Sequence, residues 1–121
     1  MNIEKNRIKA AWEGRISGCL LGKPVEMMSM REGKEFMEKF LKEANSYPLR
    51  DYINYVDSPY IRGVNIGCCK GKIKKAEQDD DITYLVLALM MLENHGLDLT
   101  TDDVARSWIN LLPAGATFTA E

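Results

Sequence analysis

The uncharged stretch at residues 82–92 constrains the fold of this chain more than any other part of the sequence. Its apolar side chains are spaced so that they point to nearly every side of a helix, and such a helix needs other elements to bury it. Asp79, Asp80 and Asp81 come directly before it. The sequence therefore predicts a buried helix over about residues 80–94 whose first turn carries a group of carboxylates.

Two interpretations of Asp79, Asp80 and Asp81 are open. Unpaired backbone N–H groups and the helix dipole favour negative charge at a helix N-terminus, so one aspartate can cap the helix while the other two lie exposed on its first turn. Alternatively, a bound cation relieves the repulsion among three carboxylates drawn toward a protein interior. Carboxylate oxygens prefer the hard ions Mg²⁺, Mn²⁺ and Ca²⁺. On pattern alone the helix cap is the commoner case.

Composition and charge limit the classes of function. The chain has 121 residues, of which 45% are hydrophobic, as in an ordinary globular domain or part of one. Its 16 basic and 18 acidic residues leave a net charge of −2, so we expect no general nucleic-acid binding. No segment approaches the ~20 apolar residues that cross a bilayer, and the first residues lack the apolar region of a signal sequence. We therefore expect a cytoplasmic protein without a membrane partner, whose cysteines are reduced.

Hydrophobic periodicity predicts an all-α chain of about four helices. The first two are expected over residues 3–21 and 31–44, and the last begins at a cap on Thr100 or Thr101 and is closed by Pro113. Residues 45–77 lose the periodicity and are interrupted by Pro and Gly, which predicts a long irregular loop between the second and third helices.

Glycines mark one side of the first predicted helix. Gly14, Gly18 and Gly22 are spaced four apart and form a strip along it, which another helix or a ligand is expected to approach closely. Gly22-Lys23-Pro24 is then expected to end the helix, because proline disfavours helical geometry in the residue before it.

Two segments together resemble the N-terminal part of the ADP-ribosylglycohydrolase family. They are Ala11-Trp12-Glu13-Gly14-Arg15-Ile16-Ser17-Gly18-Cys19-Leu20-Leu21-Gly22-Lys23-Pro24-Val25-Glu26 and, later, Asp79-Asp80-Asp81-Ile82-Thr83-Tyr84. The last residues, Phe118-Thr119-Ala120-Glu121, resemble the start of a family segment that continues into another helix. The resemblance implies an all-α fold and a hydrolase that uses a pair of Mg²⁺ ions to cleave the glycosidic bond between ADP-ribose and a protein side chain or small acceptor.

The resemblance also implies roles for particular residues. The family's Thr-Asp-Asp-Thr metal motif falls on residues 79–82, so Asp79, Asp80 and Asp81 are the implied ligands of Mg²⁺, or of Mn²⁺. Ile82 takes the place of the second threonine and cannot coordinate a metal. Glu26 matches a glutamate that lies beside the metals and the scissile bond, and it is the implied catalytic residue.

Lys70, Gly71 and Lys72 are the candidates for substrate binding. Lysine side chains and glycine-rich backbone both suit the pyrophosphate of an ADP-ribosylated substrate or a related small molecule. The alternative is a solvated loop whose positive charge balances the nearby aspartates.

The family's remaining metal-binding aspartates come from a segment that residues 1–121 do not contain. We therefore expect this chain to be the truncated N-terminal part of a single larger domain, inactive alone, with apolar faces that favour self-association. The departures at Cys19, where the family often has aspartate, and at Ile82 leave open a non-catalytic binding or structural relative of the same fold. A third alternative is a small helical interaction module in which the aspartates only cap a helix.

Overall fold

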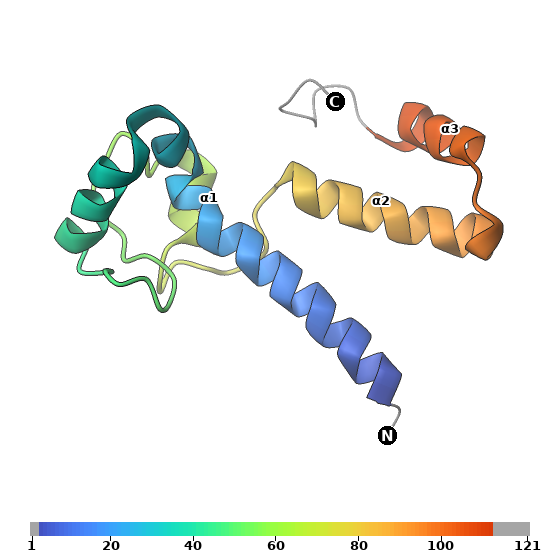
Figure 1. Cartoon of the computed structure of the whole chain (residues 1–121), viewed down its shortest axis with the longest axis horizontal. Helices are drawn as coiled ribbons and strands as arrows, with labels where there is room; N and C mark the ends of the chain where they lie inside the picture. Colours follow the sequence, from blue (N-terminus) through green and yellow to red (C-terminus); the bar gives the residue numbers. More distant parts are fainter. Residues whose placement is uncertain (1–2, 113–121) are drawn as a thin grey trace. The chain divides into compact units, whose positions relative to one another are not determined.

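The chain is all-α in the computed structural model, which describes residues 3–112 (Figure 1). Its elements, in order, are the α-helix α1 (Ile3–Glu43), the 3₁₀ helix η1 (Gly63–Cys68), α2 (Asp80–His95), the 3₁₀ helix η2 (Gly96–Asp98) and α3 (Thr101–Leu111). No strand occurs within residues 3–112, so the all-α prediction is confirmed. Among the described helices, none has the length and apolar character that crossing a membrane would require.

The chain divides into two compact units. The first unit comprises Met1–Glu77 and the second comprises Gln78–Glu121. Pro113 and the segment Phe118-Thr119-Ala120-Glu121, on which two of the sequence predictions depend, lie outside the described residues.

The first helix continues past the point where the sequence predicted its end. Pro24 lies inside α1, so the predicted stop at Gly22-Lys23-Pro24 is wrong. A proline in a helix interior costs about 3 kcal/mol or more because a hydrogen bond is lost and the ring meets the preceding turn. Burial offsets that cost: Pro24, Val25 and Met28 all lie in the interior, and fully burying one large apolar side chain contributes about 1.5–3 kcal/mol.

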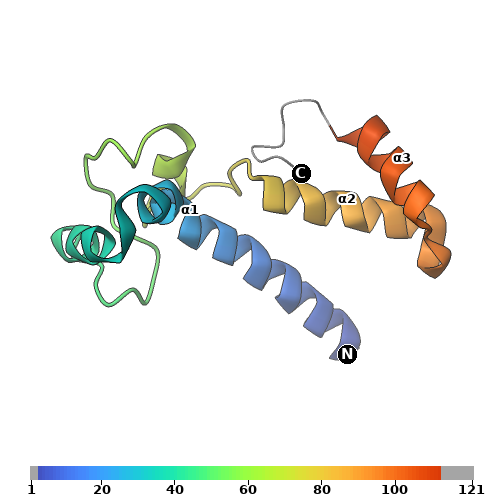
Figure 2. The ribbon, with the colours of Figure 1, turned by 45° about the horizontal axis from the view of Figure 1, so that its top comes forward.

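A corner at Gly33 divides α1 into two arms. The backbone of Gly33 has a φ of 76° and a ψ of −175°, which is not helical. The change of direction is visible in Figure 1, and Figure 2 shows it from a second direction. The arm after the corner, which ends at Glu43, corresponds to the helix predicted at residues 31–44.

Tyr60 braces this corner from the irregular segment that follows. Its hydroxyl donates a hydrogen bond to the carboxylate of Glu32, just before the corner. Its ring meets the ring of Phe36, just after the corner, edge to face at 6.0 Å. The Glu32 hydrogen bond is the main cause of the raised pKa of Tyr60. One side chain therefore contacts both arms of α1.

The core of the first unit lies between α1, on both sides of the Gly33 corner, and the irregular segment. Met28, Ile53 and Ile61 are the largest aliphatic side chains in it and are at most 1% exposed. The other buried members are Val25, Phe40, Leu41, Ala44 and Cys69. The predicted irregular loop at residues 45–77 is present, and η1 is the single helical element inside it. Apolar contacts, together with hydrogen bonds such as those of Asn54, hold this loop in place.

The second unit is built from α2 and α3, which pack through aromatic and aliphatic side chains. The rings of Tyr84 and Trp108 stack at 5.1 Å between centroids, and Leu87 and Met91 are the buried residues of α2. Four other large apolar side chains of this helix are 39–46% exposed, namely Val86, Leu89, Met90 and Leu92. The predicted burial of α2 is thus realised on one side only.

Candidate functional site

Asp79 is the N-cap of α2. Its backbone is extended, with a φ of −155°, and its carboxylate accepts a hydrogen bond from the backbone N–H of Asp81 at 3.1 Å. Its backbone carbonyl accepts two further bonds from Thr83, one from the N–H at 3.0 Å and one from Oγ1 at 2.9 Å. Asp79 is 8% exposed. The structure therefore shows the capping role that the sequence offered as one of two interpretations.

Asp80 and Asp81 form the first turn of α2 beside this cap. Asp80 is half-buried, and its Oδ1 lies 3.2 Å from the same Asp81 N–H that Asp79 caps. Asp81 is exposed, and its carboxylate makes no hydrogen bond or ion pair with any residue in the described range 3–112. Two carboxylates thus converge on one backbone donor, while the third is available to a ligand.

Glu26 lies on α1 in the first unit, whereas the aspartates belong to the second. Glu26 is exposed, and its backbone carbonyl accepts a hydrogen bond from Ser29 Oγ at 2.7 Å. Its carboxylate has no bonded partner among residues 3–112. The catalytic role of Glu26 stays a prediction.

The predicted substrate-binding residues are engaged with neighbours of their own unit. Lys70 Nζ lies 2.7 Å from Asp51 Oδ2, and this contact is the main cause of the lowered pKa of Asp51. Lys72 Nζ lies 5.8 Å from the centroid of the Tyr55 ring. Gly71 has a φ of +75°, which glycine adopts without strain. Both lysine side chains thus contact other residues of the same segment, and a substrate role for these residues stays a prediction.

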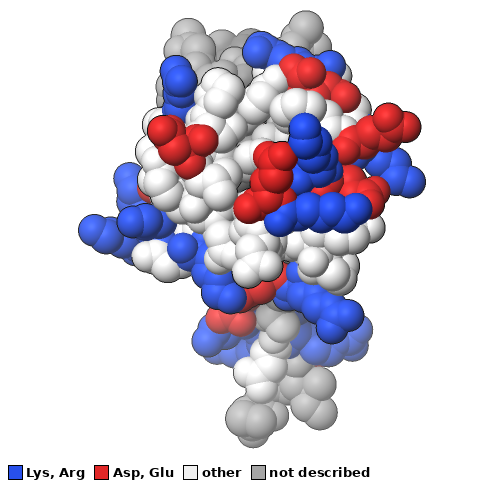
Figure 3. All heavy atoms as spheres, turned by 90° about the vertical axis from the view of Figure 1, so that its left-hand side faces the viewer, with Lys and Arg blue, Asp and Glu red and all other residues white. Residues whose placement is uncertain are grey.

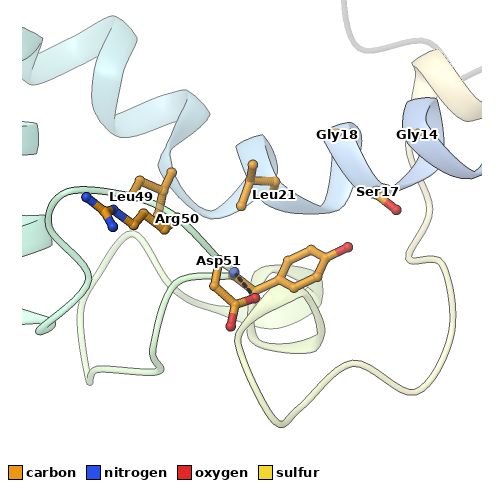
Figure 4. A pocket seen from close by; sticks show the side chains of 8 residues that line it. Gly14, Ser17, Gly18, Leu21, Leu49, Arg50 and Asp51 are labelled. Carbon is orange, nitrogen blue, oxygen red and sulfur yellow. Dashed lines mark hydrogen bonds between the residues drawn. The ribbon is translucent and has the colours of Figure 1, made fainter.

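A recess next to the glycine strip was not predicted from the sequence. It has a volume of about 440 Å³ and lies between α1 and residues 49–52 (Figure 4). Gly14 and Gly18 line it, and no described atom lies within 4 Å of where a Cβ at Gly14, Gly18 or Gly22 would be. Within the described part of the first unit, therefore, no other element packs closely against this strip, and the approach of another helix or a ligand stays a prediction.

A second, smaller recess shares Arg50, Asp51 and Tyr52 with the first. Its volume is about 170 Å³, and it is lined by Asn45, Ser46, Tyr47, Pro48, Arg50, Asp51, Tyr52, Asn54 and Lys70. No periodicity or motif in the sequence marks these residues. They come together because the core anchors both Ile53 and Ala44, which only tertiary packing decides.

Cys68 and Cys69 are inert structural residues. Both are fully buried, and Cys69 Sγ lies 3.4 Å from the backbone carbonyl oxygen of Asn65. Burial raises the pKa of the Cys69 thiol, and a protonated thiol is a poor nucleophile. No disulfide joins the cysteines of the chain, in line with the expectation of reduced thiols.

Basic and acidic side chains are interspersed on the face shown in Figure 3. The presence of both signs of charge on this face agrees with the net charge of −2. Comparison with family models, curated proteins and solved structures finds no match to this chain. The ADP-ribosylglycohydrolase-like fold therefore rests on the sequence resemblance alone.

Proposed function

We propose that Asp79, Asp80 and Asp81 bind a divalent cation, and that the chain contributes this group to an Mg²⁺-dependent hydrolase. The reaction is cleavage of the glycosidic bond that joins ADP-ribose to a protein side chain or small acceptor. The resemblance of residues 11–26 and 79–84 to the ADP-ribosylglycohydrolase family supports the reaction class. The observation that carries the cation site is the unpartnered carboxylate of Asp81 beside two converging carboxylates.

The three side chains fit a hard cation in charge and in donor chemistry. Their combined negative charge is much larger in magnitude than the roughly +0.5 charge at a helix N-terminus, so the site as a whole attracts positive ions. Each carboxylate offers about four lone-pair positions, more than one backbone N–H occupies. Mg²⁺ needs six oxygen ligands and usually retains waters. We therefore expect weak binding by this group alone and tighter binding where further protein ligands complete the shell.

In this proposal one residue of the chain orients the metal ligands and another accepts a proton. Asp79 fixes the start of α2 through its cap, and so orients Asp80 and Asp81. Glu26 would accept a proton from the attacking water while the glycosidic bond breaks and the leaving acceptor takes up a proton from solvent. Mg²⁺ held by the aspartates would supply Lewis-acid polarisation.

Mn²⁺ titration followed by NMR tests the cation site, because paramagnetic broadening is confined to residues near the ion. We expect selective broadening at residues 79–83 and an affinity about tenfold weaker in Asp81→Asn, as for loss of one charged ligand. Asp102→Asn is the matched control, since Asp102 is a first-turn acid of α3 outside the triplet. Equal weakening in both variants would show only a diffuse counter-ion effect and would contradict the site.

The hydrolase assignment needs its own measurement. Release of ADP-ribose by a protein that contains this chain should require Mg²⁺ and be lost in Asp80→Ala and Asp81→Ala. Unchanged turnover in both variants would remove these residues from the mechanism. No turnover, together with intact Mn²⁺ binding, would favour a non-catalytic relative.

The Asp79 cap at the start of α2 supports a second candidate function. If Asp79 serves only to begin α2, the chain is a helical interaction module whose acids have no ligand. The Mn²⁺ titration separates this candidate from the metal site, because it predicts no broadening confined to residues 79–83.

A further inference from the structure

The smaller recess in the first unit has walls that are fixed by hydrogen bonds. Ser46 Oγ accepts a bond from the Asn54 N–H at 3.0 Å, and Asn54 Nδ2 donates to the Ala44 carbonyl at 3.0 Å. On the far side, the Lys70 N–H donates to the Ile53 carbonyl at 2.8 Å. Ala44 and Ile53 are buried core residues. The recess is therefore a preformed feature of the fold rather than a gap between loose side chains.

Three charged side chains line this recess, and only two of them neutralise each other. Lys70 pairs with Asp51 at 2.7 Å. The pKa of Asp51 is lowered by Lys70 and by the Tyr52 N–H, so this carboxylate stays ionised at neutral pH and the pair has no net charge. Arg50 makes no ion pair or hydrogen bond within the described residues. One positive charge is left over at the recess.

Arg50 lines both the smaller and the larger recess. Figure 4 shows its guanidinium pointing away from Gly14 and Gly18, which line the larger recess. A guanidinium presents several N–H donors in a planar fork that matches the oxygens of phosphate and carboxylate groups. The volume of about 170 Å³ corresponds to roughly five to six water molecules, which is room for one such group with a partial hydration shell.

We propose that this recess binds a small oxyanion, a phosphate or carboxylate group, with Arg50 as its principal contact. The Lys70 ammonium adds attraction that Asp51 partly cancels. The site lies wholly in the first unit and does not rest on the proposed metal-dependent function. Its ligand is a single anionic group rather than a polyanion, because Arg50 is the one uncompensated charge among the residues that line the recess.

Parallel titrations with inorganic phosphate and with acetate, followed by NMR shifts of residues 45–54 and 70, test this site. The anion with the higher affinity identifies the preferred group, tetrahedral or planar. Arg50→Gln should weaken binding about tenfold, as for one charge-assisted hydrogen bond. Asp51→Asn should strengthen it about threefold, because it removes a repelling charge and releases Lys70.

Lys74→Gln is the matched control for Arg50→Gln. Lys74 is exposed and outside the recess, and its substitution removes the same charge. We expect phosphate affinity to be unchanged in this variant. Equal weakening by Lys74→Gln and Arg50→Gln, or no saturable shift of residues 45–54 and 70 in the unmodified chain, would overturn the proposal. Arg50 is itself exposed, so its substitution should leave the fold intact, which circular dichroism would verify.

Discussion

Gly33 decides the path of α1 by its backbone conformation alone. Its φ of 76° with a ψ of −175° belongs to a region that residues with a Cβ avoid. Nothing among the described residues lies within 4 Å of a Cβ built there, so side-chain space is not what requires glycine. The glycines at the strip positions are different, because they lie in regular helix.

Gly33→Ala is expected to destabilise the first unit by about 1–3 kcal/mol, the usual cost of a strained backbone conformation. The control is Gly22→Ala in the same helix, where the Cβ also meets no described atom and where alanine should stabilise by up to about 1 kcal/mol. Urea unfolding followed by circular dichroism gives both values. Equal effects of the same sign would contradict the role of the corner.

At the scale of elements, α3 has the more complete N-terminal cap. Thr100 Oγ1 accepts a bond from the Asp103 N–H, and the Asp103 carboxylate accepts one from the Thr100 N–H at 3.0 Å. His95, at the end of α2, lies 3.7 Å from the same carboxylate. Thr100 is the main cause, and His95 a smaller one, of the lowered pKa of Asp103. Both ends of the α2–α3 connection thus meet at one acid.

Thr100→Ala should destabilise the chain by about 1 kcal/mol at neutral pH, the typical cost of losing a helix cap. The lowered pKa makes Asp103 stabilising above its ordinary value of 3.8, and this contribution is lost as pH falls from there through the folded-state pKa. The difference between wild type and variant should therefore shrink in acid. Thermal unfolding at neutral pH and near pH 3 measures it.

Thr101→Ala is the control for this prediction, because Thr101 is the next residue and its side chain makes no hydrogen bond with any residue in the described range. A loss of stability equal to that of Thr100→Ala, or a difference independent of pH, would argue against the capping box as the cause.

At the scale of the whole molecule, α2 exposes apolar side chains to solvent, which is unfavourable. Val86, Leu89, Met90 and Leu92 are 39–46% exposed, and no charged residue occurs at positions 82–92. Large exposed apolar patches in soluble chains mark contacts with other protein or lead to association. This feature agrees with the expectation that the helix needs partners beyond those it has in the second unit.

We therefore expect the chain to self-associate at high concentration, and Leu89→Glu to shift it toward monomer. Burying a glutamate in an apolar contact is costly. Leu97→Glu is the control, since Leu97 is 96% exposed but lies on η2 rather than on the apolar helix. Sedimentation velocity over a wide range of concentrations provides the measurement. A monomer at every concentration, or equal dissociation by both variants, would refute the role of α2.

The sequence by itself determined the elements whose signals are local. The aspartates at residues 79–81 and the Thr100 cap mark the starts of α2 and α3 through hydrogen bonds made within one or two turns. The all-α class and the long irregular loop followed from periodicity and from its loss. The capping geometry of Asp79 was predictable for the same reason, because its bonding partners are its own neighbours.

Only the tertiary structure decided the features that depend on residues distant in sequence. Burial of Val25 and Met28 carries α1 through Pro24, and Tyr60 contacts both arms of the Gly33 corner. Arg50 and Lys70 share a recess because core packing joins their segments. Local propensities are worth fractions of a kcal/mol per residue, whereas burial of one large side chain contributes about 1.5–3 kcal/mol. Where the two disagree, packing prevails.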